Sequence, residues 1–142
     1  MIDCPLCRSD LGPVIAASAY WRLVLNHNQN ILGKCFLVSR RHLEAVSDLT
    51  LEEWIDLRSQ VQQATRLIVT AFQPDHFNYA FLQNQDRHVH LHVIPRYAAL
   101  REFDGLTFDD PDYPDHYTVP SPARRLPDRQ LTALADELRL SQ

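Results

Sequence analysis

The chain has 142 residues, a length typical of one domain with a continuous core. Apolar residues make up 45% and charged residues 23%, a balance that excludes an intrinsically disordered protein. The formal net charge of -4 gives no general attraction to nucleic acid or to anionic membranes, so phosphate must bind at a local site. We therefore expect a single domain over residues 1–142, with neither nucleic acid nor a membrane as partner.

The N-terminal residues lack the basic start and the long apolar run of a signal peptide. No apolar run approaches the roughly 18 residues that a membrane span needs. These features predict a cytoplasmic protein. Of its three cysteines, Cys4 and Cys7 are separated by two residues, and in a reducing compartment this spacing favours a metal clip over a disulfide framework.

The first half of the chain predicts a hairpin followed by a long helix. Short apolar runs from Trp21 to Leu25 and from Cys35 to Val38 are typical of strands, with the polar stretch 26–30 between them. Thr50 and Glu53 have the spacing of a capping box, so a helix starts there, and Pro74 stops it. One helical stripe is expected to face the core, formed by Leu51, Trp54, Ile55, Leu57, Val61, Ala64, Leu67, Ile68 and Phe72.

The second half predicts two strands, an irregular segment and a short helix. The strands run from Phe77 to Leu82 and from His88 to Ile94, residues 84–87 form the turn, and Pro95 ends the second strand. The glycine and prolines of 98–125 favour an irregular covering segment. A C-terminal helix is predicted over 126–140 with Asp128 as its cap. Together the elements give an α+β fold in which one long helix packs on an antiparallel sheet.

Alternation along a strand places His88, His90 and His92 on one face, while the apolar residues between them face the long helix. Three half-buried histidines could be unrelated, but three imidazoles on one face are polar groups that all need partners. A neutral imidazole is a nucleophile near neutral pH, and a second one can orient it or donate to phosphate. The pattern favours phosphoryl chemistry through a covalent P–N intermediate.

The run His88-Val89-His90-Leu91-His92-Val93-Ile94, followed by Pro95-Arg96, resembles the signature of the histidine-triad (HIT) family of nucleotide hydrolases and transferases. The segment from Gly33 to His42 is similar to the strand upstream of that signature, so the resemblance covers roughly residues 1–97 as a core. It implies a HIT-like fold, a homodimer formed through helix and strand contacts, and hydrolysis at the α-phosphate of a nucleoside 5′-phosphate derivative. Dinucleoside polyphosphates such as diadenosine tetraphosphate are the leading substrates.

The resemblance also implies individual roles. His90 attacks the α-phosphorus and carries the nucleotide, and His92 contacts the phosphate oxygens. Asn84 and Gln85 hold phosphate, and Asn26 binds the ribose hydroxyls, although Asn26 is equally well explained as a turn residue. The chain departs from the family pattern where Lys34 replaces a histidine, where Ser39 replaces a proline, and in the shorter loop before the histidines.

Cys4 and Cys7 alone are a weak signal for zinc, because a tetrahedral site needs two further ligands. Zinc-containing relatives of the HIT family resemble this chain in holding the ion with such a cysteine pair, a histidine after the basic segment and the first triad histidine. Those positions are filled here by His42 and His88. The zinc would be structural, and Cys35 a small core residue.

Two other functions remain open at this level. The three histidines could bind a catalytic zinc that activates water, although alternate residues on a strand lie roughly 6.5–7 Å apart and do not easily meet one ion. Alternatively, the chain could be a nucleotide-binding regulatory module with negligible turnover, its partners recognised through the proline-rich segment. The nucleophile at His90 is the feature that favours the enzyme.

Overall fold

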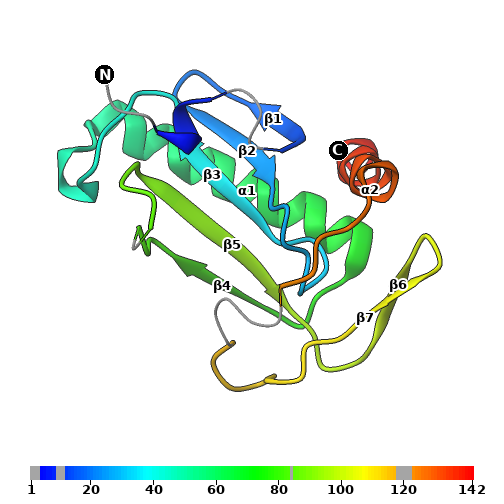
Figure 1. The fold of residues 1–142 in the computed structure, drawn as a ribbon. Coiled ribbons are helices and arrows are strands. Elements are labelled where there is room, and N and C mark those ends of the chain that lie inside the picture. The colour runs from blue at the N-terminus through cyan, green and yellow to red at the C-terminus, as the bar shows by residue number, and fades with distance from the viewer. Residues whose placement is uncertain (1–3, 9–11, 84, 118–122) are drawn as a thin grey trace.

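The computed structural model describes residues 4–8, 12–83, 85–117 and 123–142. At its centre is a five-stranded antiparallel sheet with the strand order β1-β2-β3-β5-β4 (Figure 1). The strands are β1 Val14–Ala17, β2 Trp21–Leu25, β3 Cys35–Ser39, β4 His76–Ala80 and β5 His90–Arg96. Helix α1 (Leu51–Phe72) crosses one face of the sheet, and the shorter α2 (Asp128–Leu140) packs beside it. The predicted α+β class is confirmed.

Helix α1 begins and ends where the sequence predicts. The Thr50 hydroxyl accepts from the Glu53 amide at 3.1 Å, and the Glu53 carboxylate accepts from the Thr50 amide at 2.9 Å, which completes the capping box. Arg41 binds the same carboxylate, and this hydrogen bond lowers the pKa of Glu53. At the other end Gln73 adopts the left-handed conformation, φ 48°, directly before Pro74.

The core-facing stripe of α1 is narrower than predicted. Its buried apolar members are Leu57, Ala64, Leu67, Ile68 and Phe72, which pack with β2, β3, β5 and α2. The prediction is wrong for Leu51, Trp54 and Ile55, which are 69%, 41% and 61% exposed. Leu51 and Ile55 fall beside the limited stripe that a helix presents to its core. Trp54 lies in the same direction as Phe72, about five turns earlier, and its ring meets Phe81 edge-on and not the main core. Among the described residues, no helix has the length and hydropathy needed to cross a bilayer.

The predicted hairpin is present as β2 and β3, with Trp21 opposite Ser39 and Leu25 opposite Cys35. Strand β1, which pairs with β2 on its outer side, was not predicted. It has four residues, and its register shifts between Val14 and Ala16, which removes the regular alternation by which a strand is recognised.

Strand β5 is displaced along the sequence from the predicted span. It begins at His90, so that His88 precedes it, and it continues to Arg96. The prediction that Pro95 ends this strand is therefore wrong, because Pro95 pairs with Phe77 of β4. The pairing of β5 with β3 stops at Val93, so Pro95 has a paired strand on one side, and its missing N–H is tolerated there.

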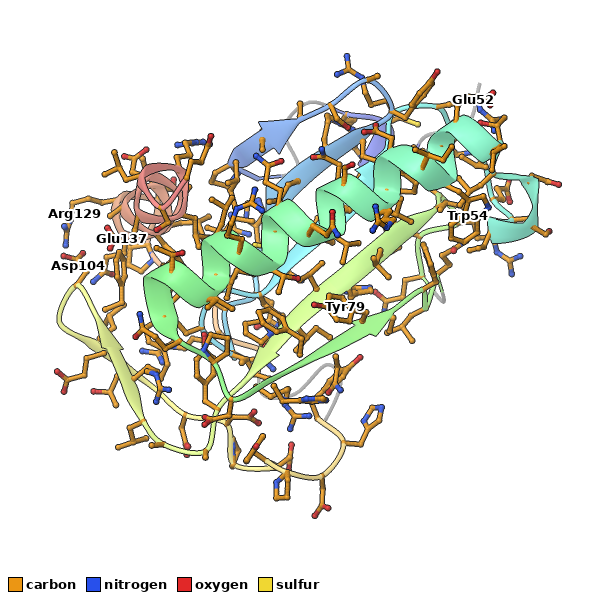
Figure 2. The ribbon with its side chains drawn as sticks, turned by 180° about the vertical axis from the view of Figure 1, so that it is seen from behind. Glu52, Trp54, Tyr79, Asp104, Arg129 and Glu137 are labelled. Carbon is orange, nitrogen blue, oxygen red and sulfur yellow. The ribbon has the colours of Figure 1, made fainter. Side chains whose placement is uncertain are left out.

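The segment 98–125 contains regular structure that was not predicted. Strands β6 (Arg101–Phe103) and β7 (Leu106–Phe108) form a hairpin, and both turn residues, Asp104 and Gly105, have positive φ. Asp104 also lies 3.4 Å from Arg129 of α2 (Figure 2). Helix α2 itself begins at Asp128 after Pro127, and it has no side-chain cap, so the capping role predicted for Asp128 is wrong.

A buried ion pair holds the chain beyond β7 against the sheet. Arg96 and Asp110 have side chains that are 2% and 1% exposed, and Arg96 Nε donates to Asp110 Oδ2 at 2.7 Å. Arg96 also donates to Asn78 Oδ1 and to the carbonyl of Asp115. Its guanidinium carbon lies 5.6 Å from the centre of the Tyr117 ring. One arginine at the end of β5 thereby anchors residues 110–117.

We expect Asp110→Ala to lower the free energy of unfolding by about 3–5 kcal/mol, because Arg96 is then left buried without its counter-charge. The double variant Arg96→Met/Asp110→Leu should lose less, since no charge remains buried. Asp136→Ala, which removes an exposed pair with Arg139, is the matched control and should change little. Urea denaturation followed by circular dichroism measures all three, and equal losses for Asp110→Ala and Asp136→Ala would contradict the anchor.

Candidate active site and metal centre

The two faces of β5 have different partners. Leu91 and Val93 belong to the main core beneath α1, as the alternation predicted. His90 and His92 point to the opposite face, where their cross-strand partners are Val38 and Phe36 of β3. A second, smaller apolar cluster lies on that face, made of Cys4, Leu6, Val24, Phe36 and Val38. The histidines therefore stand beside an apolar floor on the side of the sheet away from α1.

His90 has a fixed ring orientation. It is 7% exposed, and its Nδ1 lies 2.7 Å from the backbone oxygen of His88. A carbonyl only accepts, so Nδ1 carries the proton in this hydrogen bond, and the lone pair of the neutral ring is on Nε2. An imidazole held in this way presents a nucleophilic nitrogen.

His92 is the neutral neighbour of His90. The two ring centres lie 4.9 Å apart. Burial is the main cause, and together with electrostatic repulsion from Lys34 and from any proton on His90 it lowers the pKa of His92 to about 4. At neutral pH His92 is thus an uncharged hydrogen-bonding group, and it does not supply positive charge to a ligand.

A pocket of about 270 Å³ opens in front of these histidines. Its apolar lining includes Leu6, Phe36 and Tyr117, and its polar lining includes the amides of Asn26, Asn30 and Gln85. Among the described lining residues Lys34 carries the one lysine or arginine charge and Asp86 the one carboxylate. An apolar pocket with a few convergent polar groups is typical of a small-molecule site.

The loop 26–34, which forms one wall of the pocket, is held by a fully buried glutamine. Gln29 donates through Nε2 to the carbonyls of Asn26 and Lys34, both at 2.8 Å. Its Oε1 accepts from the Gly33 amide, also at 2.8 Å. Gly33 has φ 85°, and a Cβ there would lie 3.3 Å from Phe72 of α1. The loop is therefore fixed to itself and lies against the core.

Of the three residues predicted to bind substrate, two line the pocket. Asn26 lines the pocket, but its Oδ1 already accepts from the Asn28 amide at 2.9 Å, as in an Asx turn, so its Nδ2 is the group left for a ligand. Gln85 lines the same pocket from an exposed position. Asn84 lies outside the described residues.

Cys4, Cys7, His42 and His88 come together as one cluster, as predicted for a metal clip. Their four ligand atoms all lie within 4.8 Å of one another. His88 Nδ1 is 3.4 Å from each sulfur atom and 3.1 Å from His42 Nδ1, and Cys7 Sγ is 3.2 Å from His42 Nδ1. A tetrahedral zinc ion with two sulfur and two nitrogen ligands has edges of about 3.3–3.8 Å. The four separations lie within about 0.4 Å of these edges, so the residues can close around one metal ion with small shifts.

The metal cluster and His90 are connected through His88. Its Nε2 lies 2.7 Å from the Ser39 carbonyl, so Nε2 carries the proton and the Nδ1 lone pair faces the cluster. Burial lowers the pKa of His88, which favours the neutral form of the ring, the form that can bind a metal. The carbonyl of the same residue holds His90. One residue thus joins the metal cluster, the end of β3 and His90.

Tyr117 and Lys34 are among the pocket residues that were not predicted as site residues. Tyr117 lies 25 residues after His92 in sequence, in a segment without periodicity, and no local pattern indicates it. Lys34 replaces a histidine of the family pattern, and that replacement alone indicates no role for it. The signal that could have found it is composition, because Lys34 is the sole lysine in the chain.

The chain was compared with known proteins. The HIT domain family matches residues 13–99, and no curated protein sequence matches the chain. A histidine triad (HIT) protein from Sinorhizobium meliloti 1021 is similar in structure, with a TM-score of 0.76, 19% identity, and coverage of 94% of this chain and 91% of that one. A Zn-bound histidine triad family protein from Mycobacterium smegmatis has a TM-score of 0.65, 22% identity, and coverage of 98% and 92%.

The chain belongs to the HIT domain family, since the match extends over more than half of its length. Its fold is HIT-like, and proteins of this family are generally nucleotide-binding hydrolases or transferases. The four-residue cluster could bind a metal ion, and one of the similar solved structures is described as Zn-bound.

Proposed function

We propose that the chain is a nucleotide hydrolase or nucleotidyl transferase in which His90 forms a nucleotidyl-histidine intermediate. Its substrate is a nucleoside 5′-phosphate derivative, and a dinucleoside polyphosphate such as diadenosine tetraphosphate is the first candidate. The observation that supports this is the hydrogen bond from His90 Nδ1 to the His88 carbonyl. It leaves the Nε2 lone pair as the reactive one, in a ring that lines the pocket.

The reaction follows from these positions in two displacements. The Nε2 lone pair of His90 attacks the α-phosphorus, a P–N bond forms, and the bond to the leaving oxygen breaks. The ring becomes positively charged, and the His88 carbonyl stabilises the proton on Nδ1. Water or another acceptor then attacks phosphorus and releases its proton to the solvent, and the electrons of the breaking P–N bond return to Nε2. His92 contacts a phosphate oxygen, Asn26 the ribose, and Gln85, with Asn84, the remaining phosphate.

His90→Asn should lower kcat/KM by a factor of about 10⁴ or more, because asparagine keeps a polar side chain but offers no nucleophilic nitrogen. His76→Asn is the matched control, since His76 is an exposed histidine on β4, and it should retain full activity. Turnover is measured on dinucleoside polyphosphates, adenosine phosphoramidate and nucleotide sugars, with and without added phosphate. Protein quenched rapidly in alkali, in which a P–N bond survives, should carry one nucleotidyl group at His90 by mass spectrometry.

Wild-type turnover in a folded His90→Asn variant would contradict the mechanism. Tight nucleotide binding with no product over a long incubation would instead identify a regulatory module. A water-activating zinc held by all three histidines is disfavoured, because His88 Nδ1 faces the cysteines and its Nε2 is bound to the Ser39 carbonyl.

We further propose that the metal cluster holds a structural zinc ion. A cysteine pair and two histidines are a ligand set that zinc prefers. No ligand position is left for water, so the ion's contribution is to fix the N-terminal residues and His88, and through His88 the ring of His90.

Purified protein should contain about one equivalent of zinc by elemental analysis, and Cys4→Ser and His42→Ala should abolish stoichiometric binding. Cys35→Ala is the control and should keep the metal, because Cys35 is buried in β3 away from the cluster. Chelation should lower the melting temperature and reduce turnover less than His90→Asn does. If zinc removal abolished turnover of a fully folded protein, the ion would be catalytic and not structural.

We also propose that the chain forms a homodimer through α1 and β4. Strand β4 is an edge strand, with one side free to pair. Beside it lies an exposed apolar surface on α1, β4 and the chain after β4, made of Leu51, Trp54, Ile55, Val69, Tyr79 and Leu82. Figure 2 shows Trp54 and Tyr79 along the same side of α1. An apolar surface beside an open sheet edge is suited to self-association.

Ile55→Glu should convert the dimer to a monomer in sedimentation equilibrium, because a carboxylate would be buried without a partner at the interface. Leu140→Glu places the same charge on α2 at a residue that is 82% exposed, and it should leave the mass unchanged. A wild-type protein that sediments as a monomer at high concentration would refute this interface.

A further inference from the structure

Lys34 is unusual in two respects, its residue type and its position. It is the sole lysine among the 14 lysine and arginine residues of the chain, and it lines the pocket with His90 and His92. All the other basic side chains are arginine. A chain that uses arginine everywhere else keeps its single ε-ammonium, a compact charge that can lose its proton, at the reactive site.

The position of Lys34 is fixed by its neighbours. It directly precedes β3, and its carbonyl accepts from Gln29 Nε2 and from the Asn26 amide. Its Nζ donates to Asn30 Oδ1 at 2.6 Å. The ammonium is therefore held within the wall of the pocket and does not extend freely into solvent.

No carboxylate of the described residues forms an ion pair with Lys34. The ion pairs of the described residues do not include it, and its partner Asn30 is an uncharged amide. The groups that face it across the pocket are His92 and His90 on β5, Tyr117, and Asp86 as the single lining carboxylate. Burial lowers the pKa of Lys34 to about 8, the result expected for a half-buried cation without a close anion. An anionic ligand in the pocket would supply the counter-charge that the ammonium of Lys34 lacks.

We propose that Lys34 binds the transferred phosphate and supplies the positive charge that the neutral His92 does not. This inference rests on the proposed function of His90. Lys34 lies on the same loop as Asn26, the proposed ribose ligand, and therefore on the nucleotide side of the bond that breaks. Its contact is with the phosphoryl group that moves to His90 and not with the leaving group, so it is needed whatever the leaving group is.

Two consequences are measurable. The ammonium loses its proton above about pH 8, so the affinity for a nucleoside monophosphate falls as the pH rises through that value. Bound phosphate favours the charged form, so it shifts the titration of Lys34 to higher pH. A role in packing alone predicts neither effect.

Binding is tested by calorimetry with adenosine 5′-monophosphate and with adenosine, on the wild type, Lys34→Met and Lys34→Arg. Methionine keeps the length of the side chain and removes its charge. We expect Lys34→Met to weaken monophosphate binding by about tenfold or more, the size of a charge-assisted hydrogen bond, and to leave adenosine binding unchanged. Lys34→Arg should bind the monophosphate more tightly than Lys34→Met does. Its affinity should not decline above pH 8, because arginine keeps its proton there. Equal weakening of both ligands would overturn the inference.

The single lysine also permits a direct titration. Reductive methylation with ¹³C-formaldehyde labels one ε-amine besides the N-terminus and keeps its charge, and Lys34→Arg identifies the N-terminal signal. The Lys34 signal should titrate near pH 8 and move to higher pH with adenosine 5′-monophosphate. A titration that the ligand does not shift would refute the contact.

Kinetics on two substrates distinguishes a contact of Lys34 with the transferred phosphate from a contact with the leaving group. Lys34→Met should lower kcat/KM by the same factor for a dinucleoside polyphosphate and for adenosine phosphoramidate. A loss confined to the polyphosphate would overturn the assignment, because it would place Lys34 at the leaving group. If Lys34 governs monophosphate binding but no nucleotide is ever trapped on His90, the proposed mechanism fails and the binding site stands. If a nucleotide is trapped on His90 but Lys34→Met has wild-type kinetics, the proposed mechanism stands and the role of Lys34 is refuted.

Discussion

The hydrogen bond between His90 Nδ1 and the His88 carbonyl is the contact on which the candidate active site depends. It decides which nitrogen of the His90 ring bears the lone pair, and its acceptor is the backbone of His88, whose side chain makes two further contacts. His88 Nε2 is bound to the Ser39 carbonyl at the end of β3, and His88 Nδ1 belongs to the metal cluster. The orientation of one ring is thereby connected to the N-terminal residues and to the centre of the sheet.

The other end of β5 carries a second anchor. Arg96, six residues after His90, is buried with Asp110 and brings the chain that follows back to the pocket, where Tyr117 forms part of the lining. The HIT domain match ends at residue 99. Tyr117 lies beyond it, so part of the pocket wall is contributed by a segment outside the family match, and substrate preference can depend on it.

The sequence predicts the elements whose signals are local. The capping box of Thr50 and Glu53, the stop at Pro74 and the alternation around His90 depend on residues close together in the chain, and the structure has all three. The four members of the metal cluster were also recognised, although these required a family resemblance, because their sequence separation reaches 84 residues.

The features that were missed depend on context that the sequence does not display. Pro95 lies inside β5 because β3 has already stopped pairing there, which cannot be seen from β5 alone. Leu51 and Ile55 share the helical spacing of the core residues, and only the packing shows that they face outward. The β6–β7 hairpin is the exception, because Asp104-Gly105 is a local turn signal that the surrounding prolines obscured.

Gln29 gives the site a thermodynamic property. Its side chain is fully buried and makes three hydrogen bonds within the loop 26–34, so this wall of the pocket is already ordered before any ligand arrives. A nucleotide that binds there does not have to immobilise that wall, and the loss of conformational entropy is confined mostly to the ligand itself. Association should therefore resemble the docking of two rigid bodies, with a heat-capacity change set by the surface that becomes buried and not by folding of the loop.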